Sequence, residues 1–320
     1  MRAVRIEAHG GPEVLQLVDV PEPAPGSGEI RVRHRAIGLN FIDTYQRTGL
    51  YPVKLPATLG MEAAGEVEAV GDGVERHAVG DRVVYQGQPG AYAEANVVKA
   101  DRAVRLPNDL DFETGAAVFL KGLTAEFLTR IRPLKRPDAV LVHAAAGGVG
   151  SLLTPWLADM GVAAIGVVGS EEKAEKARDN GCAAVIVQGG DLAAEVRQLT
   201  AGRGVQVVFD SVGRDTLDAS LKCLARRGLL VSFGNASGPP RAVEPLELSR
   251  GGSLFLTRPT LFDYVATTEE LDAAAARLFD VLERGAVRVD IGQRFPLAEV
   301  RAAHEALEGR RTTGATVLLP

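Results

Sequence analysis

Residues 139–150 constrain the fold of this chain more than any other stretch of the sequence. An apolar run of strand length leads into three alanines and then into a glycine-rich turn, and an apolar helical segment follows. Strand, glycine-rich turn and helix in this order are typical of the first unit of a dinucleotide-binding fold. Gly147 would let the backbone approach a pyrophosphate, Gly150 would let the helix pack closely on the strand, and the helix N-terminus would attract phosphates. Ala145 stands where such turns usually begin with glycine.

Further strand and helix patterns follow this first unit. Apolar strand patterns recur at residues 162–168, 183–187, 205–209 and 229–233, and a helical pattern covers residues 171–180. Strands that alternate with helices predict an α/β fold with a doubly wound parallel sheet, the Rossmann arrangement. Pro155 falls inside the first of these helices, where its missing N–H would be expected to kink the helix.

Residues 1 to about 120 show a different, β-rich pattern. Short strands are expected at residues 4–7, 14–20, 29–36, 64–70, 81–85 and 91–98, with Gly-rich or Pro-rich connections. This spacing favours a small, partly open barrel. A short helix is expected at residues 41–47, ending at Gly49, and a longer helix at 116–128, with Asp111 as its cap.

The pattern changes again from residue 267. Thr268 is the expected N-cap of a helix that runs to about residue 284, with Glu269 and Glu270 in its first turn. A strand at 287–292, a helix at 299–307 and a strand at 316–319 complete the chain. So few elements cannot bury a core of their own, so we expect this tail to rejoin the N-terminal barrel.

Composition excludes several functional classes. The chain has 320 residues, of which 24% are charged, and a formal net charge of −5, which suits about two globular domains and argues against a nucleic-acid or anionic-membrane surface. Cys182 and Cys223 make no disulfide framework, which favours a cytoplasmic location. The N-terminus reads as a strand rather than a signal peptide, and no apolar run reaches the ~18 residues of a membrane helix.

Short stretches along the whole chain carry a family resemblance. In order they are residues 9–15 (HGGPEVL), 36–45 (AIGLNFIDTY), 60–65 (GMEAAG), 80–85 (GDRVVY), 119–124 (FLKGLT), 143–150 (HAAAGGVG), 210–213 (DSVG) and 231–235 (VSFGN). Together they resemble the zinc-independent medium-chain dehydrogenase/reductases, in the NADPH:quinone oxidoreductase (zeta-crystallin-like) branch. The resemblance implies a discontinuous GroES-like catalytic domain of residues 1–122 and 267–320, and a Rossmann cofactor domain of residues 123–266.

The residues argue against a zinc site. Zinc-dependent relatives of this family carry a Cys near position 40 and Gly-His-Glu at 60–62, whereas this chain has Asn40, and Met61 precedes Glu62. Neither cysteine lies in the first domain, and one carboxylate cannot hold zinc. We therefore predict neither a catalytic nor a structural zinc, and we interpret Glu62 as a structural carboxylate.

NADPH is the expected cofactor. The strand at 162–168 is followed by Gly169 and Ser170 rather than by the acidic residue that would bind a ribose 2′-OH. A hydroxyl, the ammonium of Lys173 and a helix N-terminus suit a 2′-phosphate, and the resemblance adds Arg310 to Ser170 and Lys173. The features that weigh toward NADH are Glu171, Glu172 and a shortened turn at Gln188.

Without zinc, nothing strongly polarises an alcohol, whereas quinones and activated enones accept hydride with only hydrogen-bond help. Asn40, Tyr45 and Tyr51 are the candidate donors to such a substrate, and Asp43 is expected to fix the loop or the ribose. Packed aromatic residues remain the alternative for Tyr45 and Tyr51. Lys121 either lines the nicotinamide side or is a lone charge between domains, and His143 is expected to be a packing histidine.

The resemblance also supplies the remaining cofactor contacts, several of which follow the predicted sheet strands. They are Asn40, Asp43, Tyr45, Thr124, Gly147, Gly148, Val149, Gly169, Ser211, Phe233, Gly234, Asn235 and Arg258.

Residues 251–258 read as the last strand of the sheet, at an edge. An open apolar edge invites pairing, and the resemblance implies a homodimer joined there.

The main functional interpretation is NADPH-dependent reduction of quinones. The alternatives are an enoyl-type or alkenal reductase, and a non-catalytic NADPH-binding protein that is either crystallin-like or RNA-binding. The absence of a basic stripe and of an aromatic RNA-binding signature disfavours RNA.

Overall fold

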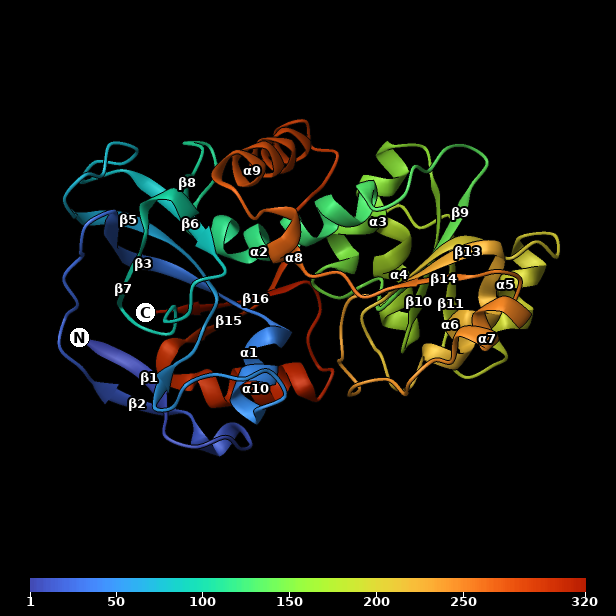
Figure 1. Cartoon of the computed structure of the whole chain (residues 1–320), viewed down its shortest axis with the longest axis horizontal. Coiled ribbons are helices and arrows are strands. Elements are labelled where there is room, and N and C mark those ends of the chain that lie inside the picture. The colour runs from blue at the N-terminus through green and yellow to red at the C-terminus, as the bar shows by residue number, and fades with distance from the viewer. The chain divides into compact units, whose positions relative to one another are not determined.

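The computed structural model describes all 320 residues, which form two compact units (Figure 1). Unit 1 contains Met1–Leu123, Val265–Phe279 and Val289–Pro320, and unit 2 contains Thr124–Tyr264 and Asp280–Arg288. No helix has the length and apolar character that crossing a bilayer requires.

Unit 2 is built on a six-stranded parallel sheet in the order β11-β10-β9-β12-β13-β14. The strands are β9 (Ala139–His143), β10 (Ala163–Val168), β11 (Ala184–Val187), β12 (Val205–Asp210), β13 (Leu224–Ser232) and β14 (Phe255–Thr257). This is the doubly wound order, so the predicted fold of this part is confirmed. The direction of winding reverses between β9 and β12, and sheets of this kind bind ligands beyond the carboxyl ends of the strands at that point.

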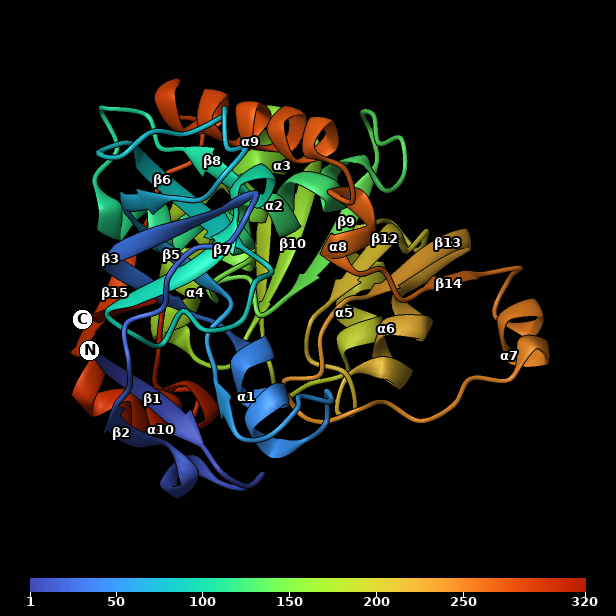
Figure 2. The same cartoon turned by 60° about the vertical axis from the view of Figure 1, so that its left-hand side comes forward.

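Helices cover both faces of this sheet (Figure 2). Helices α3 (Gly150–Asp159) and α4 (Glu171–Asp179) contact β9, β10 and β11, whereas α5 (Leu192–Leu199) and α6 (Leu217–Cys223) contact each other. Because the crossovers are right-handed and run in opposite directions from β9 and β12, α3 and α6 lie on opposite faces. The core on the side of α5 and α6 joins Leu141 and Leu230 of the sheet to Val196, Leu217 and Leu221 of these helices.

Unit 1 contains a mostly antiparallel sheet in the order β15-β16-β3-β5-β6-β8. Its strands are β3 (Glu29–Leu39), β5 (Glu62–Val70), β6 (Arg82–Gln86), β8 (Ala103–Arg105), β15 (Ile291–Pro296) and β16 (Ala315–Leu319). The long strand β3 pairs with β5 on one edge, and with β7 (Ala95–Lys99) and then β16 on the other. A smaller sheet orders β2 (Gln16–Asp19), β1 (Arg2–Ile6) and β4 (Ala57–Thr58).

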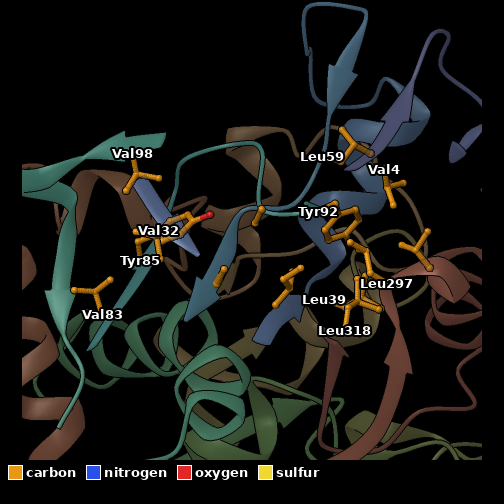
Figure 3. Packing of buried hydrophobic residues seen from close by; sticks show 14 of the residues in the cluster. Val4, Val32, Leu39, Leu59, Val83, Tyr85, Tyr92, Val98, Leu297 and Leu318 are labelled. Carbon is orange, nitrogen blue, oxygen red and sulfur yellow. The ribbon is translucent and has the colours of Figure 1, made fainter. Parts of the chain in front are cut away.

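The C-terminal tail completes the core of unit 1. Leu297 precedes α10 (Val300–Glu308), Leu318 belongs to β16, and both pack in one cluster with Val4, Leu39 and Tyr92 (Figure 3). This part of the tail therefore packs against the N-terminal strands, as expected for elements too few to bury a core of their own, whereas its segment Asp280–Arg288 belongs to unit 2.

Residues close in sequence determine where α1 ends and where α2 begins. Helix α1 (Phe41–Thr48) ends at Gly49, which has φ +80°, and α2 (Phe112–Arg130) is capped by Asp111, whose carboxylate accepts the Thr114 N–H at 2.6 Å. Both features match the sequence prediction. Helix α2 contributes residues to both units.

Some sequence predictions were wrong in detail. Helix α9 (Thr268–Glu283) is capped by Thr267 rather than Thr268, because Thr267 and Glu270 form a reciprocal capping box with N···O distances of 3.2 and 3.0 Å. Strand β15 begins at Ile291 rather than at residue 287. Val287 is buried, but its N–H donates to Val281 at the end of α9, so it closes that helix instead of opening the strand.

Two further differences concern the sheet of unit 2. Helix α3 extends on both sides of Pro155, from Gly150 to Asp159, so the proline does not end the helix, and the kink stays a prediction. The expected edge strand at 251–258 is shorter, because residues 251–253 form a turn after helix α7 (Pro245–Arg250) and only β14 pairs with β13.

Candidate functional site

The turn between β9 and α3 has the geometry that close packing demands. Ala144 adopts a left-handed conformation with φ +50°, and the Gly147 N–H donates to its carbonyl at 2.8 Å. A Cβ atom at position 150 would lie 2.3 Å from that carbonyl oxygen and 2.7 Å from Ala145 Cα. Only glycine therefore fits at 150, which is the packing role that the sequence pattern gave it. The Ser151 and Leu152 N–H groups at the start of α3 donate to the Gly147 and Val149 carbonyls at 2.8 and 3.1 Å. A phosphate at this helix N-terminus would therefore meet the N–H groups of the turn that precedes them.

The neighbouring strand β10 ends in residues that also face the carboxyl edge of the sheet. Gly169 is exposed, and Ser170 is the N-cap of α4, where its hydroxyl accepts the Lys173 N–H at 3.4 Å. Because β9 and β10 pair in parallel, their carboxyl ends are adjacent. The structure therefore brings the glycine-rich turn, Ser170 and Lys173 to one edge of unit 2.

Asp210 organises the same edge at the end of β12. Its buried carboxylate accepts the N–H groups of Val212 and Gly213 at 2.9 and 3.1 Å and the hydroxyls of Thr216 and Ser220 at 2.8 Å. The Ser220 hydroxyl also lies 2.9 Å from His143 Nε2. Burial lowers the pKa of His143, more than the nearby Asp210 charge raises it, which fits a neutral packing histidine as the sequence predicted.

The loops after β12 and β13 touch each other. A Cβ at Gly234 would lie 2.4 Å from the Ser211 carbonyl oxygen, which also accepts the Ala236 N–H at 3.2 Å. Phe233 is partly exposed and Asn235 is buried on the same loop. Ser211 thus follows β12, and Phe233, Gly234 and Asn235 follow β13, the next strand in the sheet, as the sequence analysis expected for strand ends.

A buried polar cluster in unit 1 holds Asn40, the residue between β3 and α1. The Asn40 side-chain amide donates to Glu62 Oε2 at 2.8 Å, and the Lys121 ammonium lies 3.3 Å from the same oxygen. Glu62 Oε1 accepts the Leu120 N–H of α2 at 2.5 Å. Glu62 is fully buried and Lys121 is 6% exposed, so Glu62 is the structural carboxylate that the sequence analysis expected, and Lys121 is its partner.

Asp43 lies in the first turn of α1 and is also fully buried. One oxygen of its carboxylate accepts the Asn40 N–H and the Tyr92 hydroxyl, each at 2.9 Å. Sequence reasoning missed Tyr92, because nothing in a β-rich pattern signals that a tyrosine of a loop will meet a carboxylate 49 residues away. Of the two roles expected for Asp43, this geometry provides the fixing of the loop.

Tyr45 and Tyr51 pack together at the two ends of the same segment. Their ring centroids are 5.2 Å apart in an edge-on arrangement, and the Tyr51 N–H donates to the Tyr45 carbonyl at 3.0 Å. Tyr45 is 9% exposed, whereas Tyr51 is partly exposed. Of the other candidates, Thr124 is buried on α2, Arg258 is exposed after β14, and Arg310 is exposed after α10.

The donor set of unit 1 does not fit zinc. Asn40, Lys121 and the Leu120 backbone all donate N–H groups to Glu62, so these groups satisfy one another. No group of three or more His, Cys, Asp or Glu side chains in the structure could hold a metal ion. Both cysteines are buried and belong to unit 2, whereas this cluster belongs to unit 1.

Two hollows on unit 1, of about 350 and 440 Å³, share no residue with the candidate sites. The first lies between Arg76, Val104 and the α9 residues Asp272 and Phe279, and the second is lined by residues 80–82 and 105–108.

Comparisons with known proteins define the class. The family model of the alcohol dehydrogenase GroES-like domain matches residues 26–108, and that of the zinc-binding dehydrogenases matches residues 148–280. With the doubly wound sheet of unit 2, these matches define a medium-chain dehydrogenase/reductase with a GroES-like domain and a Rossmann-type domain. The predicted fold class is confirmed.

Individual relatives narrow the class to one family. The chain is 53% identical to a quinone oxidoreductase of Pseudomonas aeruginosa (100% of this chain and 99% of the relative) and 43% identical to a 2-haloacrylate reductase of Burkholderia (99% and 98%). The solved Escherichia coli quinone oxidoreductase complexed with NADPH superposes with a TM-score of 0.98 at 46% identity, covering both chains completely. The chain belongs to the quinone oxidoreductase family, as the resemblance predicted.

Proposed function

We propose that this chain is an NADPH-dependent oxidoreductase that reduces quinones. One observation carries the proposal: the carboxyl edge of the unit 2 sheet presents a glycine-rich turn beside Ser170 and Lys173, in a chain that matches a quinone oxidoreductase solved with NADPH over its full length. The N-terminus of α3 suits the pyrophosphate of that cofactor, and a serine and a lysine at the start of α4, after the next strand, suit its 2′-phosphate.

We assign each part of NADPH to the loop that follows one strand of the unit 2 sheet. The turn after β9 would hold the pyrophosphate, the loop after β10 would hold the 2′-phosphate, and the loops after β12 and β13 would hold the remainder. The proposed contacts in unit 2 are Thr124, Gly147, Gly148, Val149, Gly169, Ser170, Lys173, Ser211, Phe233, Gly234, Asn235 and Arg258. In unit 1 they are Asn40, Tyr45 and Arg310, with Asp43 acting through Asn40.

Bound NADPH supplies the hydride, and the protein's own groups bind and orient the acceptor. A quinone that accepts hydride develops charge on its oxygen, so hydrogen-bond donors at that oxygen lower the barrier. Asn40, Tyr45 and Tyr51 are the proposed donors. The side-chain N–H groups of Asn40 already donate to Glu62 and to the Gly38 carbonyl, so Asn40 would give up the longer of these bonds, 3.3 Å to Gly38, to reach a quinone. The hydrogen bond from Asn40 to Glu62 and the contact between the two tyrosine rings limit the motion of these side chains.

The domain assignment and the absence of zinc are part of the same proposal. Residues 1–122 and 267–320 would form the catalytic domain and residues 123–266 the cofactor domain. The two compact units support this division, with junctions within two residues of those positions and one further segment, Asp280–Arg288, in unit 2. A metal-free reaction is supported by the mutual pairing of Asn40, Glu62 and Lys121.

The proposed assembly is a cytoplasmic homodimer joined at β14. On the structure, β14 pairs only with β13, and Phe255 and Leu256 are 56% and 38% exposed. An apolar edge strand with an open side is suited to pairing with a second copy. Two free, buried cysteines support a reducing compartment.

A second candidate function is the reduction of activated alkenes. The observation that favours it is the relative named 2-haloacrylate reductase, at 43% identity over nearly the whole chain. Such alkenes share with quinones a carbon that accepts hydride in conjugation with a carbonyl.

One experiment separates these functions. NADPH oxidation is followed with a benzoquinone and a naphthoquinone, beside a haloacrylate and an alkenal, at equal concentrations. Higher kcat/KM for the quinones supports the main proposal. Higher values for the alkenes would replace it with the second candidate, and NADPH binding without turnover would indicate a non-catalytic NADPH-binding protein.

A further inference from the structure

A closed ring of buried hydrogen bonds ties α1 to α10 in unit 1. From Asp43 on α1, the ring passes to Tyr92 at 2.9 Å, from the Tyr92 oxygen to His304 Nε2 at 3.0 Å, and from His304 Nδ1 back to Arg47 of α1 at 3.4 Å. Arg47 also donates to Glu308 of α10 at 2.7 Å. Asp43, Tyr92 and His304 are fully buried and Arg47 is 1% exposed.

The direction of every hydrogen bond in this ring follows from one residue. Arginine has only donors, so Arg47 makes His304 Nδ1 an acceptor. The His304 proton is then on Nε2, which donates to the Tyr92 oxygen, and the Tyr92 hydroxyl donates to Asp43. Asp43 is thus the terminal acceptor, and the same carboxylate oxygen accepts the Asn40 N–H at 2.9 Å.

The surroundings of His304 and Asp43 decide the protonation state of each side chain. Burial, and then the Arg47 charge, lower the pKa of His304 to about 3, so it stays neutral at physiological pH. Burial raises the pKa of Asp43 to about 7, although several neighbours oppose this shift. The groups that act on Asp43 are the Asn40 N–H just before α1, Tyr92 on the loop before β7, Lys121 on α2 and Glu62 on β5. His304 on α10 acts through Tyr92, and Arg47 on α1 acts through His304.

We propose that Tyr92 and His304 are positioning residues for the reduction reaction. They hold the Asp43 carboxylate against the backbone N–H of Asn40 and so fix the start of α1. The proposal rests on the proposed function, since it concerns the helix that presents Asn40 and Tyr45. Neither Tyr92 nor His304 belongs to the candidate contacts, and both act through Asp43.

The sign of the pH dependence follows from the ring. The ionised Asp43 carboxylate accepts two hydrogen bonds strongly, and protonation as the pH falls through about 7 weakens both. Because the pKa of Asp43 is raised above its unfolded value, ionisation of Asp43 lowers the stability of the folded protein. Burial disfavours the ionised carboxylate, and the hydrogen bonds from Asn40 and Tyr92 favour it. We expect kcat/KM for quinone reduction to fall on the acidic side of that pKa.

Tyr92→Phe is the test, since it removes one oxygen atom and keeps the ring that packs in the core. The lost hydrogen bond lowered the pKa of Asp43, so its removal raises that pKa. A rise of about one unit would reduce the ionised fraction at pH 7 roughly fivefold, and kcat/KM with it, with recovery toward pH 9. His304→Leu should act similarly, and His304→Gln, which keeps a donor and an acceptor, should restore part of the effect.

Tyr85→Phe is the matched control. Tyr85 is a second fully buried tyrosine of unit 1 whose hydroxyl lies 2.9 Å from a histidine Nε2, that of His34, but this pair has no hydrogen bond to α1. Both substitutions remove one buried hydroxyl from a Tyr–His pair. We expect Tyr85→Phe to lower thermal stability comparably and to keep the wild-type pH profile.

A second readout needs no turnover and therefore separates this inference from the proposed function. The infrared band of the protonated Asp43 carboxyl, identified by its loss in Asp43→Asn, is titrated in the wild type and in Tyr92→Phe. A higher midpoint in Tyr92→Phe supports the inference even if no quinone is reduced, and absent wild-type turnover overturns only the proposed function. Identical midpoints, or equal shifts in pH profile for Tyr92→Phe and Tyr85→Phe, would overturn the inference.

Discussion

Gly147 and Gly150 occupy one turn but serve different purposes. A Cβ at 150 would meet backbone atoms at 2.3 and 2.7 Å, which cannot move without shifting β9, whereas a Cβ at 147 would lie 3.1 Å from its nearest neighbour, the Ala144 carbonyl. The protein fold thus requires the glycine at 150, whereas the glycine at 147 is the one that we propose for the approach of a phosphate.

Alanine at each position should separate folding from binding. Gly150→Ala is expected to destabilise the chain by about 1–3 kcal/mol, the cost of overpacking. Gly147→Ala should cost less than about 1 kcal/mol but raise the Kd for NADPH at least roughly tenfold, because the added methyl group occupies the approach to the backbone. Thermal unfolding and NADPH fluorescence titration measure the two effects. Equal losses of affinity and stability in both variants would contradict this division of roles.

Lys173 should decide between the two nicotinamide cofactors. A charged contact to the 2′-phosphate contributes about 1.5–3 kcal/mol, so Lys173→Ala is expected to reduce kcat/KM for NADPH roughly 10- to 100-fold and leave that for NADH nearly unchanged. Arg178→Ala removes the same charge from an exposed position on the same helix and is the control. A parallel loss with both cofactors in Lys173→Ala would show that the lysine does not contact the 2′-phosphate.

At the scale of secondary-structure elements, Glu62 connects three segments. It begins β5, accepts the Leu120 N–H of α2, and binds the side chain of Asn40 before α1. Because its carboxylate is the ion-pair partner of the buried Lys121, the removal of one partner leaves an uncompensated charge.

A pair of substitutions tests this connection. Glu62→Gln is expected to destabilise unit 1 by about 3–5 kcal/mol, and adding Lys121→Met in the same chain should recover more than half of that loss, because the unpaired charge is then gone. The measurement is the midpoint of thermal unfolding for both single variants and the double variant. Additive losses in the double variant would indicate that the two side chains act independently.

The elements also show which parts of the molecule a sequence can predict. Local sequence patterns predicted correctly the features that neighbouring residues determine. These are the turn of residues 144–150, the capping of α2 by Asp111 and the end of α1 at Gly49. They failed to tell which of the adjacent Thr267 and Thr268 caps α9, because that depends on which threonine forms hydrogen bonds with Glu270.

Long-range polar contacts were beyond the reach of such patterns. Tyr92 and His304 meet across 212 residues of sequence, and neither lies in a motif, so only the folded chain shows that they surround Asp43. The candidate site was thus predicted along the glycine-rich turn and the strand ends of unit 2, while the groups that hold Asn40 and Asp43 in place were found in the structure.

At the scale of the whole molecule, the open edge of β14 governs assembly. Phe255→Lys places a charge on this edge, which should convert the proposed dimer into a monomer because a lysine at an edge strand opposes pairing. Val79→Lys makes the same change at an apolar residue that is 64% exposed in unit 1, and it should leave the dimer intact. Light scattering at micromolar concentration gives the mass. A wild-type monomer, or a Phe255→Lys dimer, would contradict assembly through β14.

The central claim is that NADPH binds where β9 passes into α3 and donates hydride to a quinone. A crystal structure of the chain soaked with NADPH tests it most directly. We expect the pyrophosphate against the N–H groups of the turn at residues 144–150 and the 2′-phosphate beside Ser170 and Lys173. A structure with that turn vacant and the nicotinamide bound elsewhere would contradict the account.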